Sequence, residues 1–440
     1  MPPSQARIKA IALRELPSSI GQRLLWYLDH YRGHDGALNC PVLCRIHGRL
    51  DVPALRASID DLTARHESLR TTFRRRGRDI QQIIHDPQPV PMTELDLAQA
   101  NAPETGFQEA VARELQTPID ASAWPVRVTL YRIGEEEHAL CVNMHHLVTD
   151  AWSCGIVLRE ICLLYERRLG RNSPLPEIPL QYSRFVQWQR ESLEGEALRQ
   201  HQRYWQRQLD NAKLPPLPLD LSRSAAGERQ SAREAADIGP AVAESLRQFA
   251  RTRKTTMFNI MLSAYYALLY RLTGQSDLTI ASLFANRQMP EVQQTVGFLA
   301  NMLLLRTRLG KATRFVDVLS STHRTVMDAI LHQSLPYYVL PIEAIRTGPR
   351  RPDDVVFQMM AQPLYNTSMA DLAVEVIVPE GVGNRFELEL ALVPRHGGFR
   401  AVLFYNPSRL DGGWTRQFIS RYAQITQAVA ANPNAALAEL

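Results

Sequence analysis

The segment Met144-His145-His146-Leu147-Val148-Thr149-Asp150-Ala151-Trp152-Ser153 joins a strand-like pattern to a helix-like pattern. In a strand, every second side chain lies on the same face, and this spacing places Leu140, Val142, Met144 and His146 on one face. This alternation puts His145 on the opposite face. His146 then lies on the apolar side, where a neutral, desolvated imidazole can accept a proton near neutral pH.

A helix is predicted directly after the histidines, from Ala151 to Leu169, with Gly170 ending it. Its apolar residues are Val157, Ile161, Leu164 and Tyr165. Asp150 precedes this helix, and aspartate is a preferred N-cap residue. A buried ion pair that fixes the loop is the other interpretation of Asp150, and both can hold. Neither makes Asp150 the proton acceptor.

Two other chemistries are possible for this segment. A zinc site would need a third ligand beside His146 and Asp150, and the five cysteines include no C-x-x-C pair, so no metal is expected. A covalent nucleophile would be Ser153 or Cys154. Both fall inside the predicted helix, and no G-x-S-x-G motif occurs, which disfavours covalent catalysis.

The N-terminal part of the chain contains two predicted helices. Ser19 followed by Gln22 is a capping-box pattern that opens the first. The second begins after Asp51 and ends near residues 65–70, and its apolar stripe is Leu55, Ile59, Leu62 and His66. We therefore expect His66 to be packed and hydrogen-bonded rather than a second base.

Later segments also have recognisable patterns. Residues 257–272 are apolar nearly all round and predict a buried helix, too short and too interrupted to span a membrane. Residues 277–281 predict a strand that leads to Arg287. Residues 386–392 and 399–404 flank two glycines and predict a hairpin. The arginines of residues 74–78 indicate a charged hairpin turn, because no nucleic-acid-binding motif accompanies them.

Composition indicates an ordinary globular protein. The 440 residues are 45% hydrophobic and 22% charged, enough for two domains with large cores. The clearest boundary signal, at residues 170–179, predicts an N-terminal lobe of 1–178 and a C-terminal lobe of 179–440. The start lacks an apolar signal segment, and the cysteines have no disulfide-framework spacing, which favours the cytoplasm. The formal charge of +5 favours an acidic protein partner.

From about Leu16 to about Asn432 the chain resembles the condensation domains of nonribosomal peptide synthetases. Their HHxxxDG motif is matched by His145, His146 and Asp150, with Ala151 in place of the glycine. The RHExLRTxF motif is matched in full by residues 65–73. Weaker matches, in the family's order, are SxAQxRLWxL at 19–28 with Gly21 for alanine, YxDFAxW at 182–188, ANR at 285–287, VGFFxN at 296–301 and HQDxPF at 332–337.

The resemblance implies an α/β fold of two chloramphenicol-acetyltransferase-like lobes, each a mixed sheet with helices, arranged as a V-shaped pseudo-dimer. It implies that a carrier protein delivers an acyl or peptidyl thioester on its phosphopantetheine arm, and that no cofactor is bound. The acceptor is an amine or hydroxyl, on a second carrier or free. His146 acts as general base or positioning group. We expect Arg287 to pair with Asp150, as the corresponding arginine does in the family, with Arg70 and Arg65 as further candidates.

Three alternatives stay open beside condensation. An epimerase of the same superfamily would invert the α-carbon of a carrier-bound residue. A docking module of the same fold would bind enzymes without catalysis. A coenzyme-A-dependent acyltransferase would need no carrier. The alanine at position 151 allows fewer backbone conformations than the family's glycine, but we expect activity to survive it. A methionine shortly before the first motif slightly favours a free-standing enzyme.

Overall fold

The computed structural model describes residues 15–31, 36–219, 231–309, 314–345, 350–360, 368–377 and 386–440. The chain divides into two compact units. Unit 1 comprises Met1–Trp188, Met289–Phe298 and Ser368–Val376, and unit 2 comprises Gln189–Gln288, Leu299–Thr367 and Ile377–Leu440. The lobes expected from sequence, 1–178 and 179–440, would assign three stretches to the second lobe that the structure groups with unit 1. These are residues 179–188, Met289–Phe298 and Ser368–Val376.

Unit 1 is built on a mixed sheet in which strand β7 is central. In the described part of the chain this sheet has six strands in the order β12-β13-β2-β7-β6-β5, and a smaller sheet has the order β1-β4-β3. Strand β7 pairs antiparallel with both neighbours, whereas β5 and β6 are parallel. The strands are β1 (Glu15–Pro17), β2 (Asn39–His47), β3 (Thr71–Arg76), β4 (Asp79–Ile84), β5 (Met92–Asp96), β6 (Val126–Arg132), β7 (Glu137–His145), β12 (Ser368–Met369) and β13 (Leu372–Val376).

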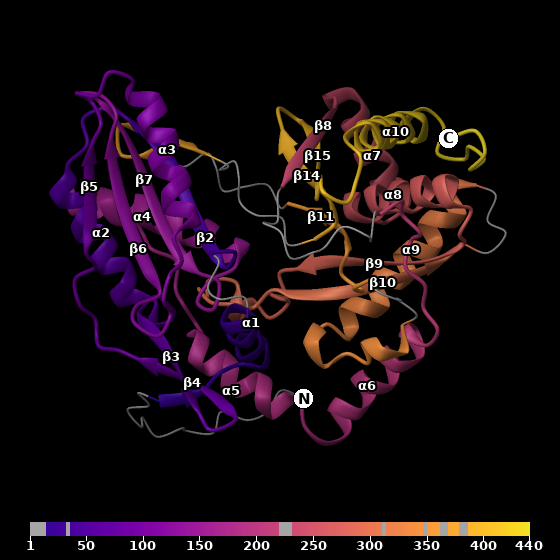
Figure 1. Cartoon of the computed structure of the whole chain (residues 1–440), viewed down its shortest axis with the longest axis horizontal. Helices are drawn as coiled ribbons and strands as arrows, with labels where there is room; N and C mark the ends of the chain where they lie inside the picture. The colour runs from indigo at the N-terminus through magenta and orange to yellow at the C-terminus, as the bar shows by residue number, and fades with distance from the viewer. Residues whose placement is uncertain are drawn as a thin grey trace. The chain divides into compact units, whose positions relative to one another are not determined.

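Two helices of unit 1 begin directly after the aspartates at which the sequence predicted them to start. Helix α2 starts after Asp51, whose side chain accepts a hydrogen bond from the Ala54 N–H, and α4 starts after Asp150. These two helices pack side by side against the large sheet (Figure 1). The helices are α1 (Ile20–Tyr31), α2 (Val52–Arg65), the 3₁₀ turn η1 (Glu67–Arg70), α3 (Pro103–Gln116), α4 (Ala151–Arg168) and α5 (Tyr182–Ser192), which runs on into unit 2.

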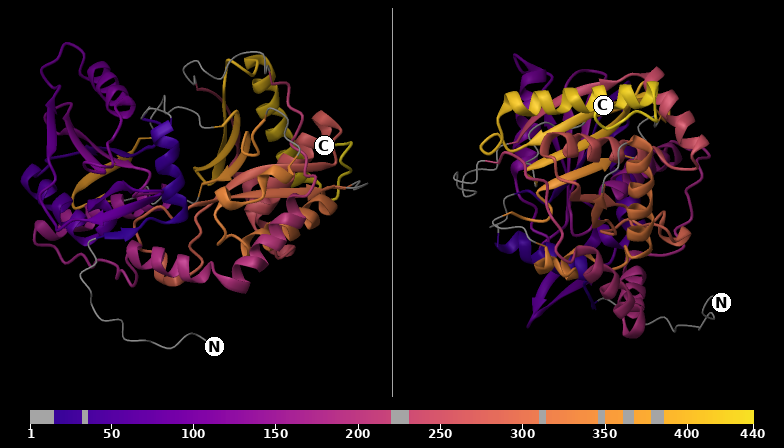
Figure 2. Two further views of the ribbon diagram at one scale, coloured as in Figure 1. Left: turned by 60° about the horizontal axis from the view of Figure 1, so that its bottom comes forward. Right: turned by 90° about the vertical axis from the view of Figure 1, so that its right-hand side faces the viewer.

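Unit 2 is also a mixed sheet with helices, and its strand order is β10-β9-β11-β14-β15-β8 over the residues described. Helix α10 lies along β8 and β15 at one end of this sheet (Figure 2). The strands are β8 (Ala232–Ile238), β9 (Asp277–Phe284), β10 (Asn301–Arg308), β11 (Val355–Met359), β14 (Leu388–Arg395) and β15 (Gly398–Tyr405). The helices are α6 (Gly195–Leu209), α7 (Pro240–Thr252), α8 (Met257–Thr273), α9 (Phe315–Leu331) and α10 (Gly412–Ala431). Short 3₁₀ turns lie at Tyr337–Val339 and Ile342–Ala344 in unit 2, and another lies at Pro290–Val292 in unit 1.

The structure confirms the predicted α/β class and several local predictions. Helix α8 is buried along most of its length, is capped by Thr256 and ends at Gly274, which has the left-handed conformation that favours glycine. Strands β14 and β15 form the predicted hairpin, and the arginines of residues 74–78 lie in the β3–β4 hairpin. Among the helices described, none combines the length and apolarity needed to cross a bilayer.

Candidate active site

The backbone turns between the two adjacent histidines. Strand β7 ends at His145, and the His145 carbonyl accepts a hydrogen bond from the Val148 N–H, which closes a turn over His146. The predicted strand, which continued through His146, is therefore one residue too long. The expected burial is also corrected, because His145 is the deeply buried one, with 1% of its surface exposed, and His146 is only partly buried.

A backbone carbonyl fixes the tautomer of His146. Its Nδ1 lies 2.7 Å from the carbonyl oxygen of Thr149. A carbonyl can only accept, so Nδ1 carries the proton and the lone pair of the neutral ring is on Nε2. The ring stands edge-to-face with Phe298, with centroids 5.0 Å apart and planes at 74°. This arrangement provides a partly buried imidazole with a basic Nε2, as general-base chemistry requires.

His145 has a supporting role in the same turn. The Leu147 N–H donates to its Nδ1 at 3.1 Å, so the proton of the neutral ring is on Nε2. That Nε2 lies 3.4 Å from Oδ2 of Asp29, on helix α1, and both side chains are buried. The ring therefore links the backbone of the turn to α1.

Helix α1 makes a second contact with the turn, which the sequence did not predict. Ser19 and Gln22 form the expected capping box, with the two reciprocal bonds at 2.9 and 3.0 Å. The same Gln22 side chain also donates from Nε2 to the Leu147 carbonyl at 2.8 Å. A buried amide thus satisfies a carbonyl that the turn would otherwise leave unpaired. The sequence signals for Gln22 were its place in the capping box and in the SxAQxRLWxL motif, and neither indicates a contact with Leu147.

Asp150 is the N-cap of helix α4, as predicted. Its Oδ1 accepts from the N–H of Ser153 at 2.8 Å and from the Ser153 hydroxyl at 2.7 Å. Ala151 is the first helical residue, so the methyl group that replaces the family's glycine stands on an ordinary helical backbone. The junction therefore accommodates alanine without strain.

A segment from late in the chain reaches the same helix end. The Ser153 Oγ lies 2.9 Å from the carbonyl oxygen of Gly297 and 3.1 Å from its nitrogen. The Tyr182 hydroxyl donates to the Phe298 carbonyl at 2.9 Å, and the Trp152 indole donates to the Gln293 carbonyl at 3.0 Å. Segment Met289–Phe298 is therefore attached to α4 and α5, which explains its place in unit 1.

The candidate arginines occupy different places. Arg287 follows β9 in unit 2, where it is buried, and its pairing with Asp150 stays a prediction. Arg65 forms an ion pair with Glu160 at 2.8 Å, and Arg70 donates to the carbonyl of His85. Like Arg65, His66 lies 2.8 Å from Glu160, so His66 is a packed, hydrogen-bonded residue, as expected.

The two rival chemistries find little support at this site. Burial raises the pKa of the Cys154 thiol well above its usual value, and the thiolate is the reactive form. The Ser153 hydroxyl is engaged by Asp150 and Gly297. Within the described ranges, no cluster of three or more histidine, cysteine or acidic residues could hold a metal ion.

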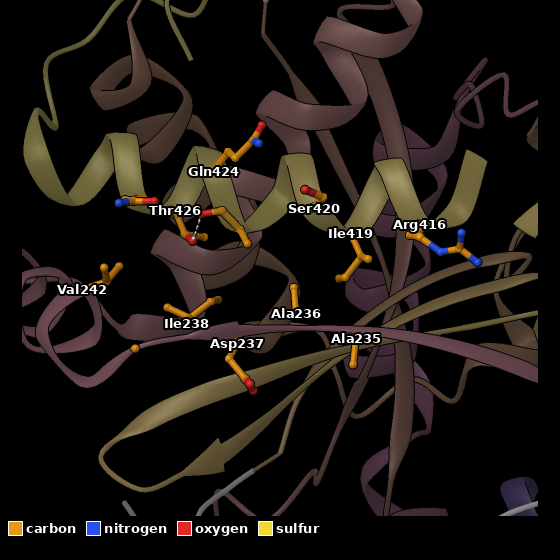
Figure 3. A pocket seen from close by; sticks show the side chains of 13 residues that line it. Ala235, Ala236, Asp237, Ile238, Val242, Arg416, Ile419, Ser420, Gln424 and Thr426 are labelled. Atoms are coloured by element: carbon orange, nitrogen blue, oxygen red, sulfur yellow. Dashed lines mark hydrogen bonds between the residues drawn. The ribbon is translucent and has the colours of Figure 1, made fainter. Parts of the chain in front are cut away.

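A separate cavity of about 470 Å³ lies in unit 2 between β8, α7 and α10 (Figure 3). Its charged lining residues are Asp237 and Arg416, and Asp237 points away from α10 in this view. Its lining residues, all in the described part of the chain, include no histidine or cysteine. The cavity therefore offers neither an imidazole nor a thiol, and the histidine turn of unit 1 remains the candidate active site.

Comparisons with known proteins identify the family to which this chain is similar. The family model for the condensation domain matches residues 13–440. Chondramide synthase of Chondromyces crocatus is 31% identical over 439 residues, which are 97% of this chain and 11% of that protein. This chain therefore spans only a small part of that relative.

Two solved structures have the same fold. The X-domain from teicoplanin biosynthesis has a TM-score of 0.86 at 24% identity, over 100% of this chain and 99% of that one. SgcC5 from Streptomyces globisporus, solved in complex with (R)-(-)-1-(2-naphthyl)-1,2-ethanediol and sucrose, has a TM-score of 0.80 at 25% identity. That match covers 96% of this chain and 100% of SgcC5.

Proposed function

This chain belongs to the condensation-domain family, and we propose that it joins a carrier-bound acyl or peptidyl thioester to an amine or hydroxyl acceptor. The observation that carries the proposal is the tautomer of His146, whose Nδ1–H is bound to the Thr149 carbonyl so that Nε2 is the basic nitrogen. Family membership supports amide formation as the coarse activity. The diol bound in the structure of SgcC5 is an additional reason to test a hydroxyl acceptor.

In the proposed reaction, the acceptor attacks the thioester carbonyl directly. The new C–N or C–O bond forms, the C–S bond breaks, and the proton of the nucleophile passes to Nε2 of His146. It then goes to the departing thiol of the phosphopantetheine arm, which is a substrate brought by the carrier. Backbone N–H groups at the start of α4, near Ala151, are the proposed donors to the developing oxyanion.

The acceptor decides how much the reaction depends on His146. An α-amine has a pKa of about 7.7–8.0, so part of it is already a free nucleophile at pH 7, whereas an alcohol needs a base far more. Removing a general base typically costs about 10²–10⁴-fold in rate. We therefore expect His146→Ala to lose most with alcohols and less with amines.

The experiment is intact-protein mass spectrometry on acyl-loaded carrier, with amine and alcohol acceptors and three proteins. These are wild type, His146→Ala and His47→Ala, a control that removes an exposed histidine of β2 in the same unit. The expected result is acyl loss with a matching new amide or ester, lost in His146→Ala and kept in the control. Full activity of His146→Ala contradicts the assignment.

Three further readouts, α-proton exchange in D2O, turnover without carrier and partner binding, separate the alternatives. An epimerase would exchange the α-proton with solvent and need no acceptor. A coenzyme-A-dependent acyltransferase would turn over without carrier. A docking module would bind its partner whether or not His146 is present. One observation favours the docking alternative: the X-domain of teicoplanin biosynthesis has been solved in complex with OxyB. The similarity of this chain to that X-domain is a similarity of fold.

A further inference from the structure

The ring of Phe298 is an aromatic neighbour of the imidazole of His146, at 5.0 Å between centroids. The two residues are 152 positions apart in the sequence, yet both belong to unit 1. The imidazole is tied through Nδ1 to the Thr149 carbonyl, and a hydrogen bond at one ring atom does not by itself fix the orientation of the ring. A contact on the face or edge of the ring helps to fix the direction of Nε2.

The backbone that carries Phe298 is firmly held. Its carbonyl accepts from the Tyr182 hydroxyl at 2.9 Å, and the preceding Gly297 makes two contacts with Ser153 at 2.9 and 3.1 Å. Gly297 also lies against the Tyr182 ring, because a Cβ at that position would stand 2.0 Å from the ring. The segment is thus seated on α4 and α5, and the Phe298 ring projects from a fixed base.

The Phe298 ring packs against helix α1 at Gly21, where the absence of a side chain provides room for the ring. A Cβ added at Gly21 would lie 2.8 Å from Cε1 and 3.3 Å from Cδ1 of that ring. Gly21 stands inside α1, so the position requires small size rather than an unusual backbone conformation. The family's motif has alanine here, and an alanine at position 21 would oblige the ring of Phe298 to move.

We infer that Phe298 is a positioning residue that fixes the imidazole of His146, and that Gly21 sets where the Phe298 ring stands. The kinetic consequence rests on the proposed function. Aromatic pairs of this geometry contribute about 0.5–1.5 kcal/mol, and 1.36 kcal/mol is a tenfold change in rate, so losing the ring lowers kcat about 2- to 13-fold. KM changes little, because Phe298 acts on the base and not on substrate binding.

The test uses the full chain and four variants: Phe298→Leu, Phe298→Tyr, Gly21→Ala and the double variant Gly21→Ala/Phe298→Leu. Phe298→Leu lowers kcat, and Phe298→Tyr recovers most of the loss because it keeps the ring. Gly21→Ala lowers kcat in the wild-type background but adds nothing to Phe298→Leu, since it acts through a ring that is already gone. Phe249→Leu, which changes a partly buried ring on α7 of unit 2, is the matched control.

Two further readouts separate positioning from stability and from the proposed function. Gly21→Ala displaces only the far end of one side chain, so its melting temperature stays close to wild type while kcat falls. The ¹⁵N signals of the His146 ring, assigned by their absence from His146→Ala, shift in both single variants and not in Phe249→Leu. These signals test the inference even if wild type transfers no acyl group or Phe298→Leu fails to fold. The inference is overturned if the effects of Gly21→Ala and Phe298→Leu on kcat multiply in the double variant, or if the His146 signals do not change.

Discussion

Replacing Glu160 with glutamine removes the negative charge from a buried cluster in unit 1. The Glu160 side chain is 0% exposed, and its Oε2 lies 2.8 Å from both Arg65 Nε and His66 Nε2. Removing one partner of a buried ion pair costs about 3–5 kcal/mol. Arg65 keeps 22% exposure and glutamine can still accept a hydrogen bond, so we expect the low end, about 3 kcal/mol.

The assay is urea unfolding at pH 7, combined with hydrogen exchange of the peptides from α2 and α4, which the cluster joins. A single urea-unfolding transition of a two-unit chain does not show which unit is destabilised, whereas hydrogen exchange locates the loss of stability in unit 1. The matched control is Glu94→Gln, because Glu94 pairs with Arg56 at the surface, with both side chains more than 40% exposed. Such pairs contribute at most about 1 kcal/mol. Equal losses in the two variants would refute the reasoning.

The pH dependence of Glu160→Gln follows from the same cluster. Burial raises the pKa of Glu160, but the hydrogen bonds and charges of His66 and Arg65 outweigh it, and the net pKa lies below the usual value. A carboxylate with a depressed pKa stabilises the fold above its unfolded pKa of about 4.3, and this is lost as the pH falls through the folded pKa. The difference between wild type and variant should therefore shrink below about pH 4.3. A difference undiminished in acid would contradict the ionic explanation.

Two further substitutions and one chemical treatment test the site. Gln22→Ala leaves the Leu147 carbonyl unpaired, so urea unfolding should show a destabilisation of about 1–3 kcal/mol and acyl transfer a lower kcat. An unchanged kcat would show that the turn does not contribute to catalysis. Gly297→Ala places a methyl group 2.0 Å from Tyr182, and the Met289–Phe298 segment should gain hydrogen exchange; unaltered exchange would contradict the close packing. Burial raises the pKa of Cys154, so mass spectrometry should show that iodoacetamide at pH 8 labels this thiol only in urea. Rapid labelling of the folded protein would favour the hypothesis that Cys154 is a covalent nucleophile.

Local hydrogen bonds explain which parts of the site were predictable from sequence. The cap at Asp150 and the capping box at Gln22 join residues three apart, so their chemistry is visible in a short window. The position of Phe298 beside His146 depends on how a distant segment packs, which no local pattern reveals. Strand β13 is a similar case, because it joins the sheet of unit 1 through β2, more than 300 residues earlier in the chain.

The end of strand β7 explains why two adjacent histidines have different surroundings. Had the strand continued through His146, that ring would lie among the apolar side chains of the sheet. The Leu147 N–H instead bonds to the ring of His145, and the chain turns one residue earlier than the alternation predicts. His145 stays in the core as a structural link, and His146 is turned out to a partly buried position.

The groups that hold His146 also suit a residue that must gain and lose a proton. Its Nδ1–H is bound to the Thr149 carbonyl, and the turn is held by the Gln22 amide at Leu147, so neither support titrates. When Nε2 accepts a proton, the Nδ1–H···O bond becomes charge-assisted and stronger. The contact with Phe298 is apolar and survives the change of charge. In the proposed reaction, protonation of His146 would therefore strengthen the hydrogen bond that holds the ring, and the proposed base would return to the same place for the next acceptor.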